Sequence, residues 1–251
     1  KGFPINFFYF TDYLSFFGII IFILLTLITK NLYLLSFGYL FLGFFFHLVD
    51  NNAAKLVWLS TLIVGVVYFI LQSYKKSGNR YIEKFKNLLF SNISFTLYIV
   101  IISFLILVFS FVFWPGSGKL PYYFEGTPIA SLIVRGKIAE VSLYSLGNFK
   151  NFLIGNGWGS IPEILLANMD AWQFDQLKAG YNLHFHTHNE VIEHFVSLGV
   201  FGFLLFVLLI YFIFKLTEGY GIFTRLTWLL FFKLSCFWFF WAATLPLMAL
   251  A

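Results

Sequence analysis

The sequence predicts an all-α integral membrane protein with six transmembrane helices and one long, partly helical loop outside the membrane. Three observations support this prediction: the composition, the recurrence of helix-length apolar runs, and the position of the basic residues beside those runs. The chain is 60% hydrophobic and only 11% charged, whereas a soluble domain carries about 25% charged residues. So little charge cannot cover a water-facing surface, and a bilayer is the expected solvent.

The predicted spans are apolar runs close in length to the ~20 residues that a helix needs to cross the hydrocarbon core. They cover residues 14–29, 32–49, 56–73, 93–114, 191–214 and 226–247. The first two are separated by a tight turn at Lys30 and Asn31, which is typical of a helical hairpin. The opening residues resemble the interior of a longer protein, so we expect further helices before Lys1.

Basic residues in the short connections predict the orientation of the chain. Alternate threading puts the connections after the first, third and fifth spans on one side of the membrane. These connections hold Lys30, Lys75, Lys76, Arg80, Lys84, Lys86, Lys215 and Arg225. This side is therefore expected to be cytoplasmic, and the loop 115–190 and both termini to lie outside. Lys233, within the sixth span, is expected to extend its side chain toward the cytoplasmic face.

Two other classes are disfavoured by composition. The net charge of +5 does not indicate nucleic-acid binding, because most of the basic residues lie beside apolar spans. The single Cys236 excludes a disulfide framework within the chain.

The chain divides into three predicted segments: residues 1–114 with four spans, 115–190 as the long outer loop, and 191–251 with two spans. The loop is far longer than a connection requires, and such loops tend to carry function. Its periodicity predicts a helix over residues 130–146 that stops at Gly147. A second helix is expected to open at Ser160 with a capping box to Glu163 and to end near Lys178.

Four histidines lie within eleven residues: His184, His186, His188 and His194. Ionisable residues at the start of a membrane helix indicate a functional site by default. In an extended strand the first three would share one face and could bind a metal, although no zinc-protease pattern or nearby cysteine accompanies them. Alternatively, one imidazole acts as a general base at neutral pH. A third interpretation is that the histidines only solvate the start of the helix.

Other candidates lie earlier in the loop. Arg135, with Lys137 close by, offers a rigid fork suited to phosphate oxygens, although a lone arginine on a helix is more often a solvated surface charge. The Gly155-Asn-Gly157-Trp-Gly159 turn could present backbone N–H groups to phosphate. It matches no nucleotide-binding fingerprint, because no strand–turn–helix unit surrounds it.

Taken in order, these pieces resemble the shared domain of bacterial O-antigen ligases and Wzy-type O-antigen polymerases. The resemblance is carried by Arg135, by Gly155 and Gly157, by His186-Thr-His188-Asn189, and by Gly199-Val-Phe-Gly202, with nine residues between Asn189 and Gly199. It covers residues 93–214. Three departures leave the choice between ligase and polymerase open: few spans, Lys119 where ligases carry a second arginine, and Phe203 where ligases often have threonine.

The resemblance implies a function at the periplasmic face of the bacterial inner membrane. An undecaprenyl-diphosphate-linked glycan would be transferred, with inversion, to a hydroxyl of lipid A-core or of a growing glycan. His188 would be the general base and Arg135 would bind the diphosphate. His186, Asn189, Glu193, Lys137, Gly155 and Gly157 would contact or orient the substrate, and Gly199 and Gly202 would have a packing role. No metal or other cofactor is expected.

Three alternatives remain at this point. One is the polymerase, and another is a related ligase that transfers glycan to protein. The third, from a different class, is a transporter or a metal- or pH-sensing subunit. A transporter is expected to carry ionisable residues or broken helices at mid-membrane. The predicted spans are nearly free of ionisable residues apart from Lys233 and His47, which favours chemistry in the loop.

Overall fold

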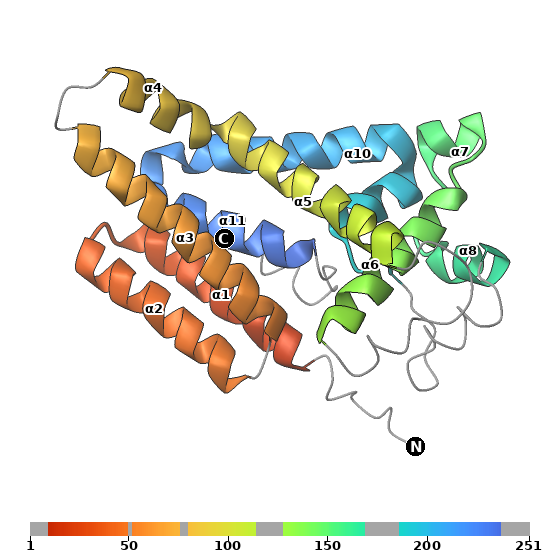
Figure 1. The fold of residues 1–251 in the computed structure, drawn as a ribbon, viewed down its shortest axis with the longest axis horizontal. Helices are drawn as coiled ribbons and strands as arrows, with labels where there is room; N and C mark the ends of the chain where they lie inside the picture. Colours follow the sequence, from red (N-terminus) through yellow and green to blue (C-terminus); the bar gives the residue numbers. More distant parts are fainter. Residues whose placement is uncertain (1–9, 50–51, 76–79, 114–127, 169–185, 237–251) are drawn as a thin grey trace. The chain divides into compact units, whose positions relative to one another are not determined.

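The computed structural model describes residues 10–49, 52–75, 80–113, 128–168 and 186–236 (Figure 1). Every regular element in these ranges is a helix. They are α1 Phe10–Ile28, α2 Leu32–Leu48, α3 Asn52–Lys75, α4 Arg80–Leu89, α5 Asn92–Phe113, α6 Pro128–Tyr144, α7 Phe149–Ile154, α8 Ile161–Asn168, α10 Glu190–Leu216, the 3-10 helix η3 Thr217–Tyr220, and α11 Ile222–Ser235.

Within these ranges three helices are long and apolar enough to cross a membrane: Ala54–Tyr74, Asn92–Phe113 and Glu190–Tyr220. The apolar parts of α1 and α2 are shorter. Together with α3, α5 and α10, α1 and α2 coincide with five predicted spans. The sixth predicted span falls partly outside the described residues, and α11 covers only its beginning. The all-helical, membrane-embedded character is therefore as predicted, while the number of spans stays a prediction.

The outward faces of these helices are strongly apolar. Large hydrophobic side chains are exposed along α1, α2, α3, α5 and α10, among them Phe37, Phe44, Ile63, Phe111 and Leu205. Soluble monomers rarely expose contiguous apolar surface on this scale. Small polar side chains lie inside instead: Ser15, Thr61, Ser103 and Ser110 are fully buried, as is common where membrane helices pack closely.

The chain forms two compact units, which are described separately. Unit 1 comprises residues 1–96, 211–234 and 240–251, and unit 2 comprises residues 97–210 and 235–239. These bounds differ from the three predicted segments. The helices of the predicted loop share unit 2 with most of α5 and α10, because their apolar residues are buried against those helices.

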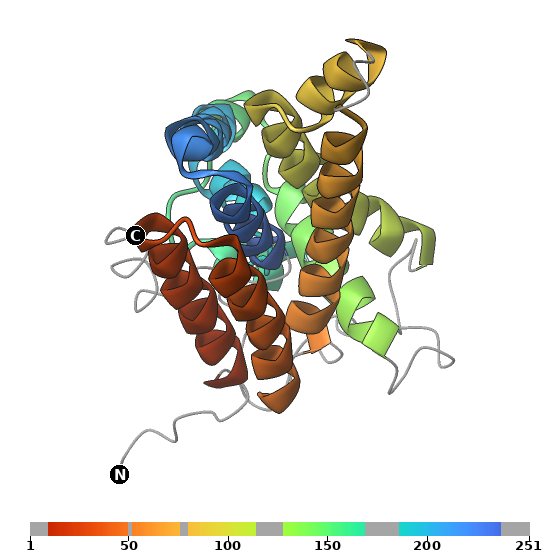
Figure 2. The same ribbon diagram turned by 90° about the vertical axis from the view of Figure 1, so that its left-hand side faces the viewer.

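In unit 1, α1, α2 and α3 lie side by side (Figure 2). Glycines let α1 and α2 approach closely, since a Cβ atom on Gly18 would lie 2.8 Å from the Phe45 ring and one on Gly38 would lie 2.7 Å from the Phe22 ring. The turn between them is closed by Asn31, whose side chain accepts hydrogen bonds from the backbone of Tyr33 and of the next residue.

The three basic connections predicted to share one membrane side lie at one end of unit 1. Lys30 and Gly221 line the same small pocket, which places the α1–α2 turn beside the turn before α11. Arg225 donates to the carbonyl of Phe90 and to the side chain of Asn92, both at 2.8 Å, which places the α4–α5 corner there as well. The connections after the first, third and fifth predicted spans therefore lie together, while the side of the membrane that they face stays a prediction.

Lys233 has a different environment from the one predicted. Its side chain is only 2% exposed, and its ammonium group donates to the hydroxyls of Ser60 and Thr61 on α3. The prediction that it extends toward the membrane surface is therefore wrong. The hydroxyl groups of α3 supply local acceptors, which make the longer reach to water unnecessary.

Unit 2 has a hydrophobic core that joins the loop helices to two membrane helices. Buried residues of α6, α8 and α10 form it, with partly buried residues of α5 packed against them. The core contains Ile133, Ile138, Ala139, Val141, Leu146, Ile161, Ile164, Leu165, Ile192 and Val196. Gly136 allows α6 to approach α5 closely, because a Cβ atom there would lie 2.5 Å from that of Ser110. The hydroxyl of Ser110 donates to the carbonyl of Ile133 at 3.1 Å.

The predicted helices of the loop are partly correct. The helix expected over residues 130–146 is α6, which begins with Pro128, a residue suited to the first helical turn. The second helix begins at Ile161 as expected, and its predicted continuation to Lys178 lies outside the described residues beyond Asn168. The Ser160 hydroxyl donates to the carbonyl of Gly157 at 2.8 Å, and the described contacts include no capping-box hydrogen bond between Ser160 and Glu163.

Candidate functional site

Asn189 holds the histidine segment at the start of α10. Its side-chain oxygen accepts a hydrogen bond from the backbone N–H of Ile192 at 3.2 Å, so it caps the helix. Its amide nitrogen donates to the carbonyl of Ser103 on α5 at 3.3 Å. The hydroxyl of Thr187 donates to the carbonyl of Asn189 at 2.9 Å. The sequence His-Thr-His-Asn therefore folds into a tight, internally bonded turn.

The contact with α5 is made near the middle of that helix. Ser103 lies about 15 Å along the helix axis from Phe113, at a rise of roughly 1.5 Å per residue. The segment before α10 thus contacts α5 at mid-length.

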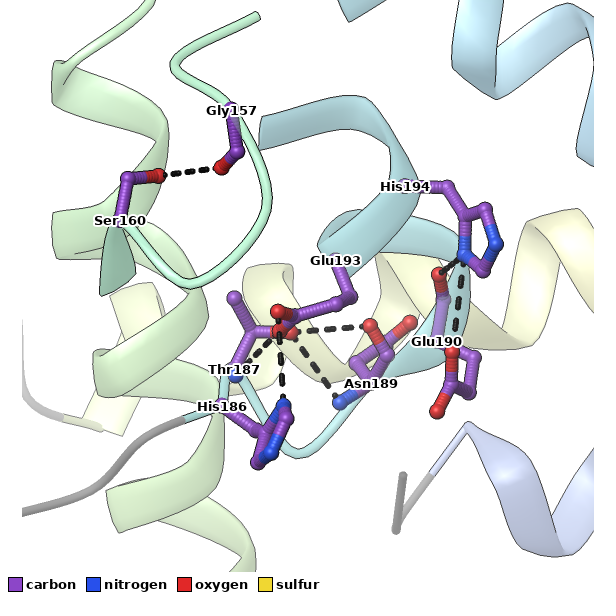
Figure 3. Close-up of polar contacts among 8 residues, drawn as sticks. All are labelled: Gly157, Ser160, His186, Thr187, Asn189, Glu190, Glu193 and His194. Carbon is purple, nitrogen blue, oxygen red and sulfur yellow. Dashed lines mark hydrogen bonds and ion pairs between the residues drawn. The ribbon is translucent and has the colours of Figure 1, made fainter. Parts of the chain in front are cut away.

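Glu193 connects two parts of the cluster (Figure 3). One of its carboxylate oxygens accepts the backbone N–H of Thr187 at 2.7 Å. The other lies 3.5 Å from Nδ1 of His186. The Glu193 side chain is 3% exposed and that of His186 is 37% exposed. A buried carboxylate thus orients an imidazole that solvent reaches, an arrangement that fixes the ring for proton transfer or for binding a hydroxyl group.

His188 is both buried and conformationally unusual. It is 6% exposed, and its backbone has φ of 56°, the one positive value among the described residues other than glycine. Histidine is enriched in this left-handed region relative to most residues. Such a conformation persists only where the surroundings enforce it, and it is found preferentially at functional sites. The neighbouring Asn189 cap and the Thr187 bonds provide that enforcement.

His194 points to a separate side of α10 (Figure 3). Its Nδ1 lies 2.7 Å from the carbonyl oxygen of Glu190 and 3.5 Å from that residue's carboxylate. Its ring stacks on Phe206 with centroids 4.0 Å apart and meets the edge of Trp158 at 5.2 Å. These contacts give His194 a packing role. His184, the remaining histidine of the predicted cluster, lies outside the described residues.

The two basic residues of α6 differ in environment. Arg135 is half-buried on α6. Ile133 and Ile138 of the same helix belong to the hydrophobic core that also contains Ile192 of α10. Lys137 is 2% exposed, and its ammonium group pairs with the carboxylate of Glu140 at 3.0 Å. Glu140 also accepts the hydroxyl of Tyr144 at 2.8 Å. A substrate anion would have to compete with Glu140 for Lys137, whereas Arg135 is closer to solvent. Lys119 lies outside the described residues.

The glycine turn meets a break in α10. Gly199 has φ of 65° and ψ of −161°, which interrupts the helix. The carbonyls freed by this break are bonded to the turn: the N–H of Asn156 donates to Val196 at 3.0 Å and that of Gly157 to Ser197 at 2.9 Å. The N–H of Gly155 donates to Asn151 at 2.7 Å. These groups already have protein acceptors, which argues against the predicted contact of Gly155 and Gly157 with phosphate.

The glycine turn and the break in α10 cross in close contact, and this crossing explains why both segments need glycine. A Cβ atom on Gly155 would lie 2.3 Å from the backbone of Ser197, and one on Gly199 would lie 2.4 Å from the backbone of Leu153. Gly202 follows the break, and a Cβ atom there would lie 2.0 Å from that of Leu198 in the preceding turn. The Gly-x-x-Gly pair therefore shapes the break in α10 and its contact with the loop.

Among the described residues no three His, Cys, Asp or Glu side chains are grouped as a metal site. Because His184 is not described, the metal alternative stays open for the complete cluster.

Two features were not anticipated from the sequence. Asn156 organises the turn, since its side chain bonds Ser145, Asn151 and Val196. Ser103 supplies the carbonyl that Asn189 binds. The Asn between two glycines was a usable signal for the first, because Asn is favoured in turns for its local hydrogen bonds. Nothing in the pattern of a Phe- and Ile-rich span marks the carbonyl of Ser103.

Comparison of the chain with protein-family models, with curated proteins and with solved structures finds no match. The resemblance to O-antigen ligases and polymerases therefore rests on the motif residues themselves, and the function that follows is a proposal.

Proposed function

We propose that this protein is a membrane glycan transferase of the O-antigen ligase type. It moves a glycan from undecaprenyl diphosphate to an acceptor hydroxyl, such as one on lipid A-core, at the periplasmic face of the bacterial inner membrane. The observation that carries the proposal is His188. This residue is held in a left-handed conformation within a buried polar turn that Asn189 and Glu193 organise.

In the proposed reaction the acceptor oxygen attacks the anomeric carbon of the glycan. The bond from that carbon to the diphosphate oxygen breaks, and its electron pair leaves with undecaprenyl diphosphate. The imidazole of His188 takes the proton of the acceptor hydroxyl. Attack opposite the leaving group inverts the anomeric configuration. General-base assistance of this kind contributes about 10²–10⁴-fold to a rate.

Arg135 is proposed to bind the diphosphate and to stabilise the charge that develops on it. A guanidinium group can donate two parallel hydrogen bonds to phosphate oxygens. Its helix shares a hydrophobic core with the start of α10, so Arg135 and the histidine turn belong to one compact unit. Electrostatic stabilisation of the leaving group is strongest where water is excluded.

His186 and Glu193 are proposed to orient the acceptor. The imidazole of His186 is the more exposed of the two, and the buried Glu193 carboxylate lies 3.5 Å from it. Protein acceptors already occupy the N–H groups of Gly155 and Gly157, and Glu140 pairs with Lys137. We therefore assign Gly155, Gly157 and Lys137 to the support of the site.

The test uses the full-length protein in membrane vesicles supplied with a lipid-diphosphate-linked glycan and lipid A-core. His188→Ala is expected to lower transfer by about 10² or more, and Arg135→Ala by a similar factor. Arg135→Lys restores part of the rate at most, because lysine lacks the fork. Lys150→Ala, at an exposed position of α7 in the same unit, is the control. Wild-type transfer by His188→Ala would sink the proposal.

A deletion strain separates ligase from polymerase. Loss of a ligase leaves bare lipid A-core at the cell surface, whereas loss of a polymerase leaves core capped by one repeat unit. Transfer that persists in the presence of a chelator counts against the metal-binding alternative.

A further inference from the structure

Helix α4 presents an apolar stripe to the outside of unit 1. Tyr81, Phe85 and Leu88 follow the i, i+4, i+7 spacing of one helix face, and they are 85%, 54% and 67% exposed. Leu89 adds to the same face. The sequence prediction treated this segment only as a basic connection between two spans. The structure shows a ten-residue amphipathic helix there.

The orientation of α4 is fixed by its opposite side. Lys86 is buried, and its ammonium group donates to the side-chain oxygen of Gln72 on α3. The same group lies 5.6 Å from the centre of the Tyr68 ring. Phe90, just after the helix, packs against Tyr68 with ring centroids 5.0 Å apart. Thus α4 folds back along the last turns of α3, and its apolar stripe faces away from the protein.

Arg225 holds the chain just after α4. It donates to the carbonyl of Phe90 and to the side chain of Asn92, and its guanidinium lies 4.7 Å from the centre of the Phe95 ring. The last turn of α4 is therefore tied to α3, and the residues after it lead directly into α5, and both of these helices are long enough to cross a membrane. A segment held in this way cannot move far from the membrane surface.

The charge on α4 matches an anionic surface. Arg80 and Lys84 are exposed, and helical geometry of about 100° per residue puts both at one border of the apolar stripe. The flanking chain adds Lys75 and Lys76, and the helix itself carries one acidic residue, Glu83. A basic polar border beside an apolar stripe is typical of helices that lie in the membrane interface and bind anionic lipids.

Exposed apolar side chains also lie on the two helices that adjoin α4. Phe69, Ile70 and Tyr74 are exposed on the adjoining end of α3, and Ile93 is exposed at the start of α5. We propose that α4 is an interfacial helix: Phe85 and Leu88 contact acyl chains, while Arg80 and Lys84 bind the headgroups of anionic phospholipids. This inference is independent of the proposed glycan transfer.

The first arm of the test measures depth. Cys236→Ser provides a cysteine-free background and keeps a hydroxyl beside Ser103, which now bonds the thiol at 3.1 Å. Spin labels are placed by Phe85→Cys, Leu88→Cys and, on the exposed polar side, Asn87→Cys. The full chain is reconstituted in phosphatidylcholine–phosphatidylglycerol vesicles. Collisions with oxygen should dominate at 85 and 88, and collisions with a water-soluble nickel chelate at 87.

Two results of this arm overturn the proposal. Nickel collisions that dominate at 85 and 88 would show that the stripe lies in water. Labels that neither reagent reaches would show that another protein surface covers it.

The second arm measures lipid selectivity. Arg80→Gln and Lys84→Gln should each lower the preference for spin-labelled phosphatidylglycerol over phosphatidylcholine by roughly two- to fivefold at low salt, and high salt should reduce the difference. Lys150→Gln on α7 removes an equal charge from the segment expected on the other side of the membrane, and it should leave the preference unchanged. Equal behaviour of the three variants overturns the headgroup assignment.

Discussion

Asn156 donates to the carbonyl oxygen of Val196 twice, from its backbone N–H at 3.0 Å and from its side-chain amide at 3.1 Å. That carbonyl belongs to the turn of α10 that precedes the break at Gly199. A helix interrupted among apolar neighbours exposes carbonyls that must find other donors, because the surroundings offer no water. The loop supplies these donors to the membrane helix.

Asn156→Ala should therefore destabilise the protein. The substitution removes side-chain hydrogen bonds to Ser145, Asn151 and Val196, and we expect a cost of about 2–3 kcal/mol. Asn156→Asp should also be destabilising, since it replaces the amide donor by an acceptor facing the Val196 carbonyl. Thermal unfolding in detergent, followed by circular dichroism, measures both, and exposed Lys150→Ala is the control. A melting temperature unchanged by Asn156→Ala would contradict this account.

The glycines of the crossing should tolerate substitution unequally. Gly155→Ala and Gly199→Ala each place a methyl group within 2.4 Å of backbone atoms at a positive φ, and we expect losses of about 3 kcal/mol or more. Gly157→Ala is the matched variant, because its φ is also positive but nothing lies within 4 Å. It should cost only about 1 kcal/mol. The yield of folded protein and its melting temperature rank the three, and equal losses would argue against the tight crossing.

Arg225→Lys should not preserve the α4–α5 corner. Lysine can keep one contact to Phe90 or Asn92 but loses the planar fork and its position over Phe95. We expect Arg225→Ala to cost about 2 kcal/mol and lysine to recover less than half. Arg80→Lys, at an exposed arginine in the same unit, serves as the control. Proteolysis between α3 and α5 in vesicles provides a local readout, and cleavage should be faster in both Arg225 variants.

The hydrogen bond from Tyr144 to Glu140 should stabilise the folded protein slightly, and this stabilisation should be lost at high pH. Its hydrogen bond to Glu140, with burial and the carboxylate charge adding to it, raises the pKa of Tyr144 above its ordinary 10.0. The protonated phenol is thus favoured in the folded state. Its contribution is complete below pH 10 and is lost as pH rises through the higher folded value.

The measurement compares wild type with Tyr144→Phe. Because the side chain is largely exposed, the difference should stay below about 1 kcal/mol at pH 8 and shrink above pH 10. A difference that grows with pH would reverse the assignment.

The sequence predicted the helices well wherever apolar length and periodicity decide the outcome. The bounds of α2 and α5 differ from the predicted spans by one residue at most at either end. It missed α4, because Lys86 is inside and Phe85 outside, the reverse of what a charged connection suggests. It also misjudged Lys233, whose acceptors Ser60 and Thr61 lie more than 170 positions away in the chain. Contacts of that range leave no local pattern.

The candidate site was predictable in composition but not in geometry. The motif identified His188 and Asn189, and the cap formed by Asn189 follows from its position before an apolar helix. The left-handed backbone of His188 and the contact of Asn189 with Ser103 depend on how α10 packs against α5. The glycines were noted as a possible anion cradle, whereas tertiary packing uses their N–H groups within the protein.

The link between Asn156 and Val196 has a consequence for biosynthesis. The two residues are separated by 40 positions, so the turn is synthesised before the carbonyls that it binds. The two parts can join only after α10 has formed and bent at Gly199. Unit 2 therefore closes only once α10 is complete, and a released chain truncated before Val196 should keep its loop open to protease.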